Sequence, residues 1–172
     1  SNIIGSNNAA FGYGALYNNT TSNNSAFGYR ALFANTTGFR NSAFGLYSLK
    51  SNTSGTYNTA FGYRSLFSNV LGSDNVAVGT QALYSNTTNY NVAIGHEALS
   101  TNITDSHNTA IGNNALKTSN GGTHNTAVGS ASMNALTSGD YNVGVGSQTF
   151  DSLTTGSNNV GVGYAALGAN TS

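Results

Sequence analysis

Cysteine, proline and tryptophan are absent from this 172-residue sequence, and charged residues make up only 6% of it. Without cysteine there can be no disulfide bond and no thiolate metal site. Without proline every residue keeps a backbone N–H, which suits a chain that is hydrogen-bonded along most of its length. No apolar run approaches the roughly 18 residues of a membrane-spanning helix, so we expect no membrane contact by this segment.

The few charges limit the kinds of partner that the chain could bind. Five basic residues are offset by five acidic ones, so the formal net charge is zero. Nucleic-acid binding needs a surplus of Lys and Arg on one face, and we therefore expect no nucleic-acid partner. The basic residues are scattered along the chain as Arg30, Arg40, Lys50, Arg64 and Lys117.

A five-residue phrase recurs ten times and organises the whole chain. It reads Asn, a small or β-branched residue, Ala or Gly, an apolar residue and Gly, as in Asn41-Ser42-Ala43-Phe44-Gly45. Successive glycines from Gly12 to Gly163 are 17 residues apart seven times and 16 apart twice. A large apolar residue, usually leucine, follows four residues after each glycine. Both shorter spacings lose a residue in the loop before the next Asn, so this loop is the part of the unit that tolerates a change in length.

A 17-residue unit is too short for a pair of helices, and its Gly, Asn and Thr content disfavours helix. We therefore predict an all-β fold, a parallel β-solenoid of ten coils with one coil per unit. Short strands are expected from Asn to Gly and around the leucine. Residues 1–172 are expected to form one continuous repeat array, an excerpt of a longer protein, because the sequence begins and ends within the pattern.

Stacking of the coils would align equivalent residues into columns. The Ala of the phrase and the leucine after the Gly are expected to fill the coil interior. The Gly column marks a bend where φ is positive or a neighbouring backbone passes closely. The Asn column, from Asn8 to Asn159, would either form an amide ladder between coils or cap the turn.

The apolar residue before each Gly adjoins the small residue, so in a strand the two side chains point to opposite faces. With the small residue inside, the apolar residues form an outward stripe. A stripe of this length exceeds what a soluble monomer normally exposes, so we predict self-association, side by side along parallel axes or end to end in a filament. The alternative is that the parity is reversed, with the apolar residues inside and the small residues outside, because a bend can change which face a residue points to. The stripe consists of Phe11, Phe27, Phe44, Phe61, Val78, Ile94, Ile111, Val128, Val145 and Val162.

The unit resembles the head repeats of YadA-type trimeric autotransporter adhesins, whose shorter coils carry a similar Asn-Ser/Thr-x-Ala-x-Gly run. It is also similar to the Asn-Thr-Ala-Val-Gly-x-x-Ala-Leu arrays of some phage tail fibres and chaperone-terminated bacterial surface proteins, which residues 108–116 and 125–129 match. The resemblance covers essentially the whole chain. It implies a left-handed β-roll coil, a parallel homotrimer and an extracellular, cell-surface or virion location. Neither family supplies a catalytic residue.

The ionisable residues form no recognisable catalytic or metal-binding set. His107 and His124 share the column directly before the anchor Asn and are expected to stack on adjacent coils. No third ligand joins them, whereas a protein zinc site normally has three or four. The five acids are never paired at one level of the coil. We therefore expect no enzyme, no bound metal and no cofactor.

The column before the anchor Asn is the most varied and is the candidate ligand-facing surface, because binding residues often lie on loops held by a rigid scaffold. A second aromatic column lies five residues after the Gly. Aromatic faces can stack on sugar rings, so a host surface glycan or matrix is a candidate partner; alternatively, stacked aromatics only cover the coil edge. The first column contributes Arg40, Tyr57, Tyr90, His107, His124 and Tyr141, and the second Tyr17, Phe33, Phe67 and Tyr84.

The sequence thus predicts a structural and adhesive segment of an extracellular fibre, such as a surface adhesin head or stalk. The alternative is a phage or phage-like tail-fibre shaft, which would have the same physical structure but would belong to a phage particle. A third hypothesis is a glycan- or ice-binding solenoid. Ice binding would need a regular threonine grid, which pairs such as Thr36-Thr37 provide and Val70-Leu71 and Asn120-Gly121 interrupt.

Overall fold

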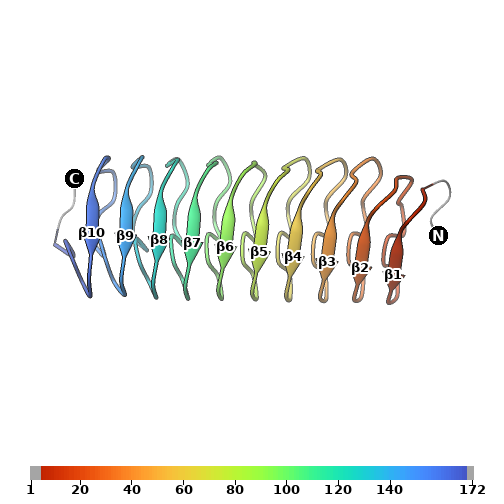
Figure 1. The fold of residues 1–172 in the computed structure, drawn as a ribbon, viewed down its shortest axis with the longest axis horizontal. Coiled ribbons are helices and arrows are strands. Elements are labelled where there is room, and N and C mark those ends of the chain that lie inside the picture. Colours follow the sequence, from red (N-terminus) through yellow and green to blue (C-terminus); the bar gives the residue numbers. More distant parts are fainter. Residues whose placement is uncertain (1–4, 170–172) are drawn as a thin grey trace.

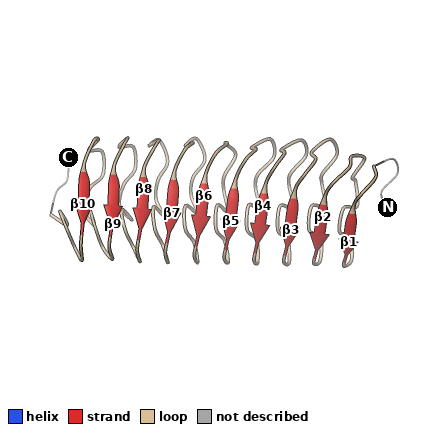
Figure 2. Ribbon diagram, in the orientation of Figure 1, coloured by secondary structure: helices blue, strands red, loops and turns tan. Residues whose placement is uncertain are grey.

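The computed structural model describes residues 5–169, which wind into one β-solenoid with the two ends of the chain at opposite ends of a rod (Figure 1). One parallel sheet contains ten strands in sequence order, and no helix occurs among the described residues (Figure 2). The predicted all-β parallel solenoid with one coil per repeat is confirmed. The strands are β1 (Ala9–Phe11), β2 (Ser25–Phe27), β3 (Ser42–Phe44), β4 (Thr59–Phe61), β5 (Val76–Val78), β6 (Val92–Ile94), β7 (Thr109–Ile111), β8 (Thr126–Val128), β9 (Val143–Val145) and β10 (Val160–Val162).

The register of the sheet sets equivalent residues of the repeat side by side. Phe27 lies beside Phe44 between β2 and β3. Val78 lies beside Ile94 between β5 and β6, although the intervening coil has only 16 residues. The lost residue therefore lies in the loop and does not shift the strands, as the repeat spacing predicts.

Each coil in the described residues has one strand, so the second strand expected around the leucine is wrong. This segment is a turn because Tyr47 and Leu49, like their equivalents, have φ angles of 62° and 48°. Two left-handed residues within one short segment bend the chain too sharply for an extended strand. The turn is still tied to the next coil, since the Leu49 N–H donates to the Ser65 carbonyl at 3.0 Å.

The interior of the solenoid is filled by two apolar columns, as predicted. Except for Ala10 and Leu167 in the end coils, which are exposed, the strand alanines and the leucines after the Gly are buried, and Leu83 and Leu99 are 0% exposed. In the last coils the two columns change together. Gly144 faces Met133, and a Cβ added to Gly161 would lie 2.8 Å from the Phe150 ring. A larger side chain in one column is therefore accommodated by the loss of a methyl group from the other.

The anchor asparagines link neighbouring coils and cap a turn at the same time, so both predicted roles are observed. The Asn108 side chain accepts the Asn125 N–H at 2.8 Å and donates to the Gly122 carbonyl at 2.7 Å. Asn125 directly precedes β8, and Gly122 lies in the loop that leads into this strand. The same pair of bonds repeats from Asn8 to Asn142.

A second asparagine ladder, seven residues after the Gly, was not singled out from the sequence. Asn52 Nδ2 donates to Asn35 Oδ1 at 2.8 Å, and both side chains are buried. At Ser119 the ladder changes, and the serine hydroxyl donates to the buried Asp105 carboxylate at 2.7 Å. Leu136 occupies the same position one coil later. The two ladders lie side by side, because Asn41 and Asn52 both donate to the Gly55 carbonyl, at 2.7 and 3.0 Å.

Candidate functional site

The outward face of the ten-stranded sheet is the first candidate site. The small middle residue of each strand from β2 to β10 is buried and the flanking residues point outward, so the predicted strand parity is observed and the reversed parity is wrong. At the two ends Phe11 and Val162 are 74% and 70% exposed, and Ile94 between them is 38% exposed. Phe44 and Val128 are half-buried, and the other stripe residues are exposed.

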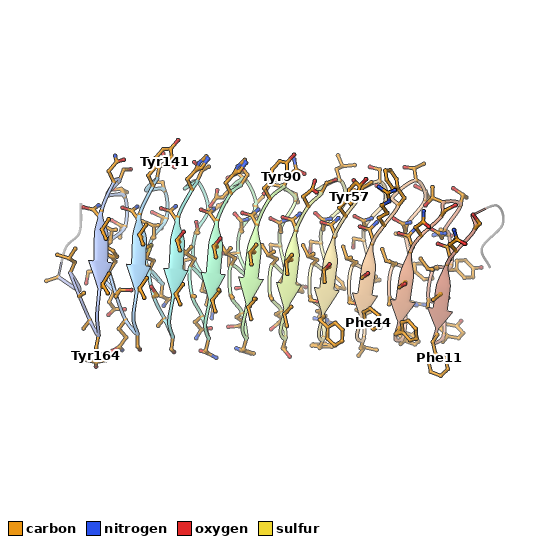
Figure 3. All side chains as sticks on the ribbon, in the orientation of Figure 1. Phe11, Phe44, Tyr57, Tyr90, Tyr141 and Tyr164 are labelled. Carbon is orange, nitrogen blue, oxygen red and sulfur yellow. The ribbon has the colours of Figure 1, made fainter. Side chains whose placement is uncertain are left out.

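One row of this strand face is apolar, and neither outward row is charged, from β1 to β10. The Phe27 and Phe44 rings stack at 4.8 Å and the Phe44 and Phe61 rings at 4.9 Å. The first outward residue of each strand is alanine, serine, threonine or valine, so neither outward position carries a charge from β1 to β10. Figure 3 shows Phe11 and Phe44 along one edge of the sheet.

The column before the anchor Asn lies along the opposite edge, where Figure 3 labels Tyr57, Tyr90 and Tyr141. Its C-terminal part is a continuous stack of four rings. His107 and His124 stack at 4.7 Å, as predicted, with Tyr90 and Tyr141 at 4.9 and 4.8 Å on either side. All four side chains are exposed.

The N-terminal part of this column surrounds an open hollow of about 650 Å³. Arg40 donates a hydrogen bond to the Tyr57 hydroxyl and lies 5.9 Å from the Phe39 ring. The opposite wall is residues 20–23, the loop of the 16-residue first coil. The structure therefore places Arg40 and Tyr57 together and apart from the four-ring stack.

A third candidate site follows the Gly in the N-terminal half, and we call it the cation–aromatic face. In each of the second, third and fourth coils, the residues two and five after the Gly are one cation and one aromatic. Arg30 lies 5.2 Å from the Phe33 ring, and Lys50 lies 5.1 Å from the Phe67 ring. The face consists of Tyr13, Tyr17, Tyr29, Arg30, Phe33, Tyr47, Lys50, Tyr63, Arg64, Phe67 and Tyr84.

The cation–aromatic face contains all four residues of the predicted second aromatic column, with Tyr17–Phe33 and Phe67–Tyr84 each stacked at 5.2 Å. Its cations were missed, because in the linear sequence they are scattered. Counting each basic residue from the preceding Gly gives the signal: Arg30 and Arg64 are two residues after it and Lys50 is five after it.

The remaining ionisable groups of the described residues form one ion pair and no larger cluster. Among residues 5–169 no three His, Cys, Asp or Glu side chains are grouped closely enough to hold a metal ion. Lys117 pairs with Glu97 at 2.7 Å, and its hydrogen bond lowers the pKa of that carboxyl. Asp105 is buried and accepts hydrogen bonds from the Thr104 and Ser119 hydroxyls.

The threonine rows at the loop are interrupted, and their hydroxyls are bonded within the fold. The Thr36 and Thr53 hydroxyls each donate to a carbonyl of the next coil at 3.1 Å. Val70, Ile103 and Asn120 occupy the same position in other coils. The flat, regular threonine grid that ice binding would need is not continuous along the rod.

Comparison with known proteins does not identify a function for this chain. No family model, curated protein or solved structure matches the chain. The described residues contain no helix able to cross a membrane. The strand face, the column before the anchor Asn and the cation–aromatic face are the features from which a function has to be inferred.

Proposed function

We propose that this chain is a structural and adhesive segment of an extracellular fibre, in which copies of the solenoid associate side by side through their strand faces. The observation that carries the proposal is the uncharged strand face with its apolar stripe, which runs from β1 to β10. Continuous apolar surface of this extent normally marks an interaction site. The centres of protein interfaces are likewise depleted of charged residues.

A parallel copy of the same chain is the partner that fits this face. In a cyclic assembly whose axis runs along the rod, each coil stays level with its equivalents. The phenylalanines of β1–β4 would then meet phenylalanines, and the valines of β8–β10 would meet valines. The number of chains, three, follows from the resemblance to trimeric adhesin heads. Stacking of rods end to end into a filament is the alternative arrangement.

The test introduces two charges into the middle of the strand face, with Ile94→Asp and Ile111→Asp combined. We expect the wild-type chain to sediment with the mass of three chains and the double variant with the mass of one, because a buried, unpaired carboxylate costs several kcal/mol. The matched control is Tyr90→Asp with His107→Asp, which adds the same charge on the opposite edge. That column already contains Asp74, and the control should keep the wild-type mass.

Circular dichroism of each variant shows whether the solenoid remains folded. A single-chain mass for the wild type at high concentration would contradict the proposal. So would an unchanged mass for the folded Ile94 and Ile111 double variant. A ladder of increasing masses for the wild type would instead support the filament.

A further inference from the structure

The charges of this chain are segregated along the rod. Residues 1–73 contain four basic residues and no acid, so they carry +4. Residues 74–172 contain five acids and Lys117, so they carry +1 − 5 = −4. The zero net charge therefore conceals a positive N-terminal half. Its basic residues are Arg30, Arg40, Lys50 and Arg64.

Three of these cations lie on the cation–aromatic face, where they contact rings and no carboxylate. The Arg64 guanidinium lies 5.1 Å from the Tyr63 ring and 5.4 Å from the Phe67 ring. The ion pair in the described part of the chain joins Lys117 to Glu97, outside this face. A ring attracts the cation through its quadrupole but has no negative charge with which to neutralise it.

The two arginines also retain a hydrogen-bond donor without an acceptor. The Nε atoms of Arg30 and Arg64 are buried and have no hydrogen-bond partner among the described residues. Almost all buried polar groups in proteins are satisfied, so each exception requires an explanation. A guanidinium is a planar fork of donors whose geometry matches a carboxylate. An anionic ligand would supply the negative charge that these cations lack.

A cleft of about 350 Å³ opens beside Arg30, between the first and second coils. Tyr13, Tyr17 and Phe33 provide its aromatic walls. The cleft exists because Gly14 occupies the position that Arg30 has one coil later. A Cβ added to Gly14 would lie 3.2 Å from Arg30 Cγ and 3.3 Å from the Phe33 ring. A mainly apolar cleft with one charged group is the usual form of a small-ligand site.

We propose that this cleft and the adjoining cation–aromatic face bind an acidic polysaccharide whose pyranose units carry carboxylates. Sugar rings have apolar C–H faces that stack on aromatic rings, and a carboxylate on such a ring pairs with Arg30. Lys50 and Arg64 lie on the next two coils, and neighbouring coils are about 4.8 Å apart, which is close to the length of one sugar unit. The inference rests on the adhesive role proposed above, for which it names the ligand class, and it does not depend on self-association.

Titration calorimetry with an oligogalacturonate tests this site, with a neutral galacto-oligosaccharide and single-stranded DNA as comparison ligands. Two variants disable the site in different ways. Arg30→Gln removes the charge, and Gln81 occupies the same position of the repeat three coils later. Gly14→Gln keeps every charge and fills the cleft. Arg40→Gln is the matched control, because it removes one positive charge from the opposite edge.

We expect the wild type to bind the oligogalacturonate in preference to both comparison ligands. Arg30→Gln and Gly14→Gln should each weaken binding about tenfold or more, and Arg40→Gln should change it by no more than about twofold. Equal affinity for DNA would overturn the proposal in favour of a general polyanion surface. Equal affinity for the neutral sugar, equal loss with Arg40→Gln, or no binding would also overturn it. Sedimentation of the same samples reports self-association separately.

Discussion

Replacing Asn108 by aspartate changes one atom of a buried side chain and tests whether the anchor asparagine ladder holds the coils together. The Asn108 amide accepts the Asn125 N–H at 2.8 Å and donates to the Gly122 carbonyl at 2.7 Å. A carboxylate would keep the first bond but set an oxygen against the Gly122 carbonyl oxygen. A protonated carboxyl group would keep both bonds, because its hydroxyl can donate to that carbonyl.

The folded state of Asn108→Asp therefore favours the protonated acid. Burial and the facing carbonyl raise the pKa of the introduced carboxyl above its unfolded value of about 3.9. Because the folded pKa is the higher one, the stabilisation is fully present below the unfolded pKa and is lost as the pH rises through the folded pKa. A shift of about 2–3 units corresponds to a loss of about 3–4 kcal/mol at neutral pH, at about 1.4 kcal/mol per unit.

Urea unfolding measures the difference at acidic pH, below the unfolded pKa, and again at neutral pH. Asn113→Asp is the control, because Asn113 is exposed in the same coil and gains the same charge. We expect Asn108→Asp to match the wild type in acid and to lose stability at neutral pH, while the control stays within about 0.5 kcal/mol of the wild type. Hydrogen exchange should confine the loss to β7 and its neighbours, since a coil contacts only adjacent coils. Equal losses at the two pH values would refute the role assigned to the ladder.

Two further experiments test the packing and the backbone of the coil. Gly161→Ala should lower the free energy of unfolding by about 1–3 kcal/mol through overpacking against Phe150, and adding Phe150→Leu should recover most of the loss; thermal melts showing additive effects would contradict the pairing. Ala131 has φ 54°, where an L-residue is disfavoured by about 1–2 kcal/mol. Ala131→Gly should therefore leave denaturant stability unchanged or raise it, and a loss of about 1 kcal/mol would contradict the left-handed turn.

The columns and the strand parity could be predicted because they follow from spacing alone. Adjacent residues of a strand point to opposite faces, so a small Ala77 beside Val78 already indicates which side faces the interior. The turn at the leucine could not be predicted in the same way. Leu83 has φ 50°, a conformation that a bulky residue rarely adopts. It is imposed by the closure of the coil, which no property of leucine indicates.

A candidate site could be predicted from the sequence where all its residues share one position of the repeat. It could not be predicted where residues from two positions of the repeat come together. The stack of His107 on His124 follows from their common position in the repeat. The cation–aromatic face combines Arg30 and Arg64, two residues after the Gly, with Lys50, five residues after it. The left-handed residues of the turn bring these two positions onto one face. That bend was unknown from the sequence, so the basic residues could not be assigned to a common surface.

Three changes in surface chemistry coincide between β4 and β5. The outward stripe passes from phenylalanine to aliphatic residues between Phe61 and Val78, Arg64 is the last cation of the positive half, and Asp74 is the first acid. The buried alanine, leucine and asparagine columns cross the same level without a break. One scaffold therefore carries two surface segments, a positive one with an aromatic strand stripe followed by a negative one with an aliphatic strand stripe. Charges placed at Ile94 and Ile111 would act in the second segment, whereas the proposed binding cleft lies in the first. The proposed self-association and the proposed ligand binding can therefore be tested one at a time.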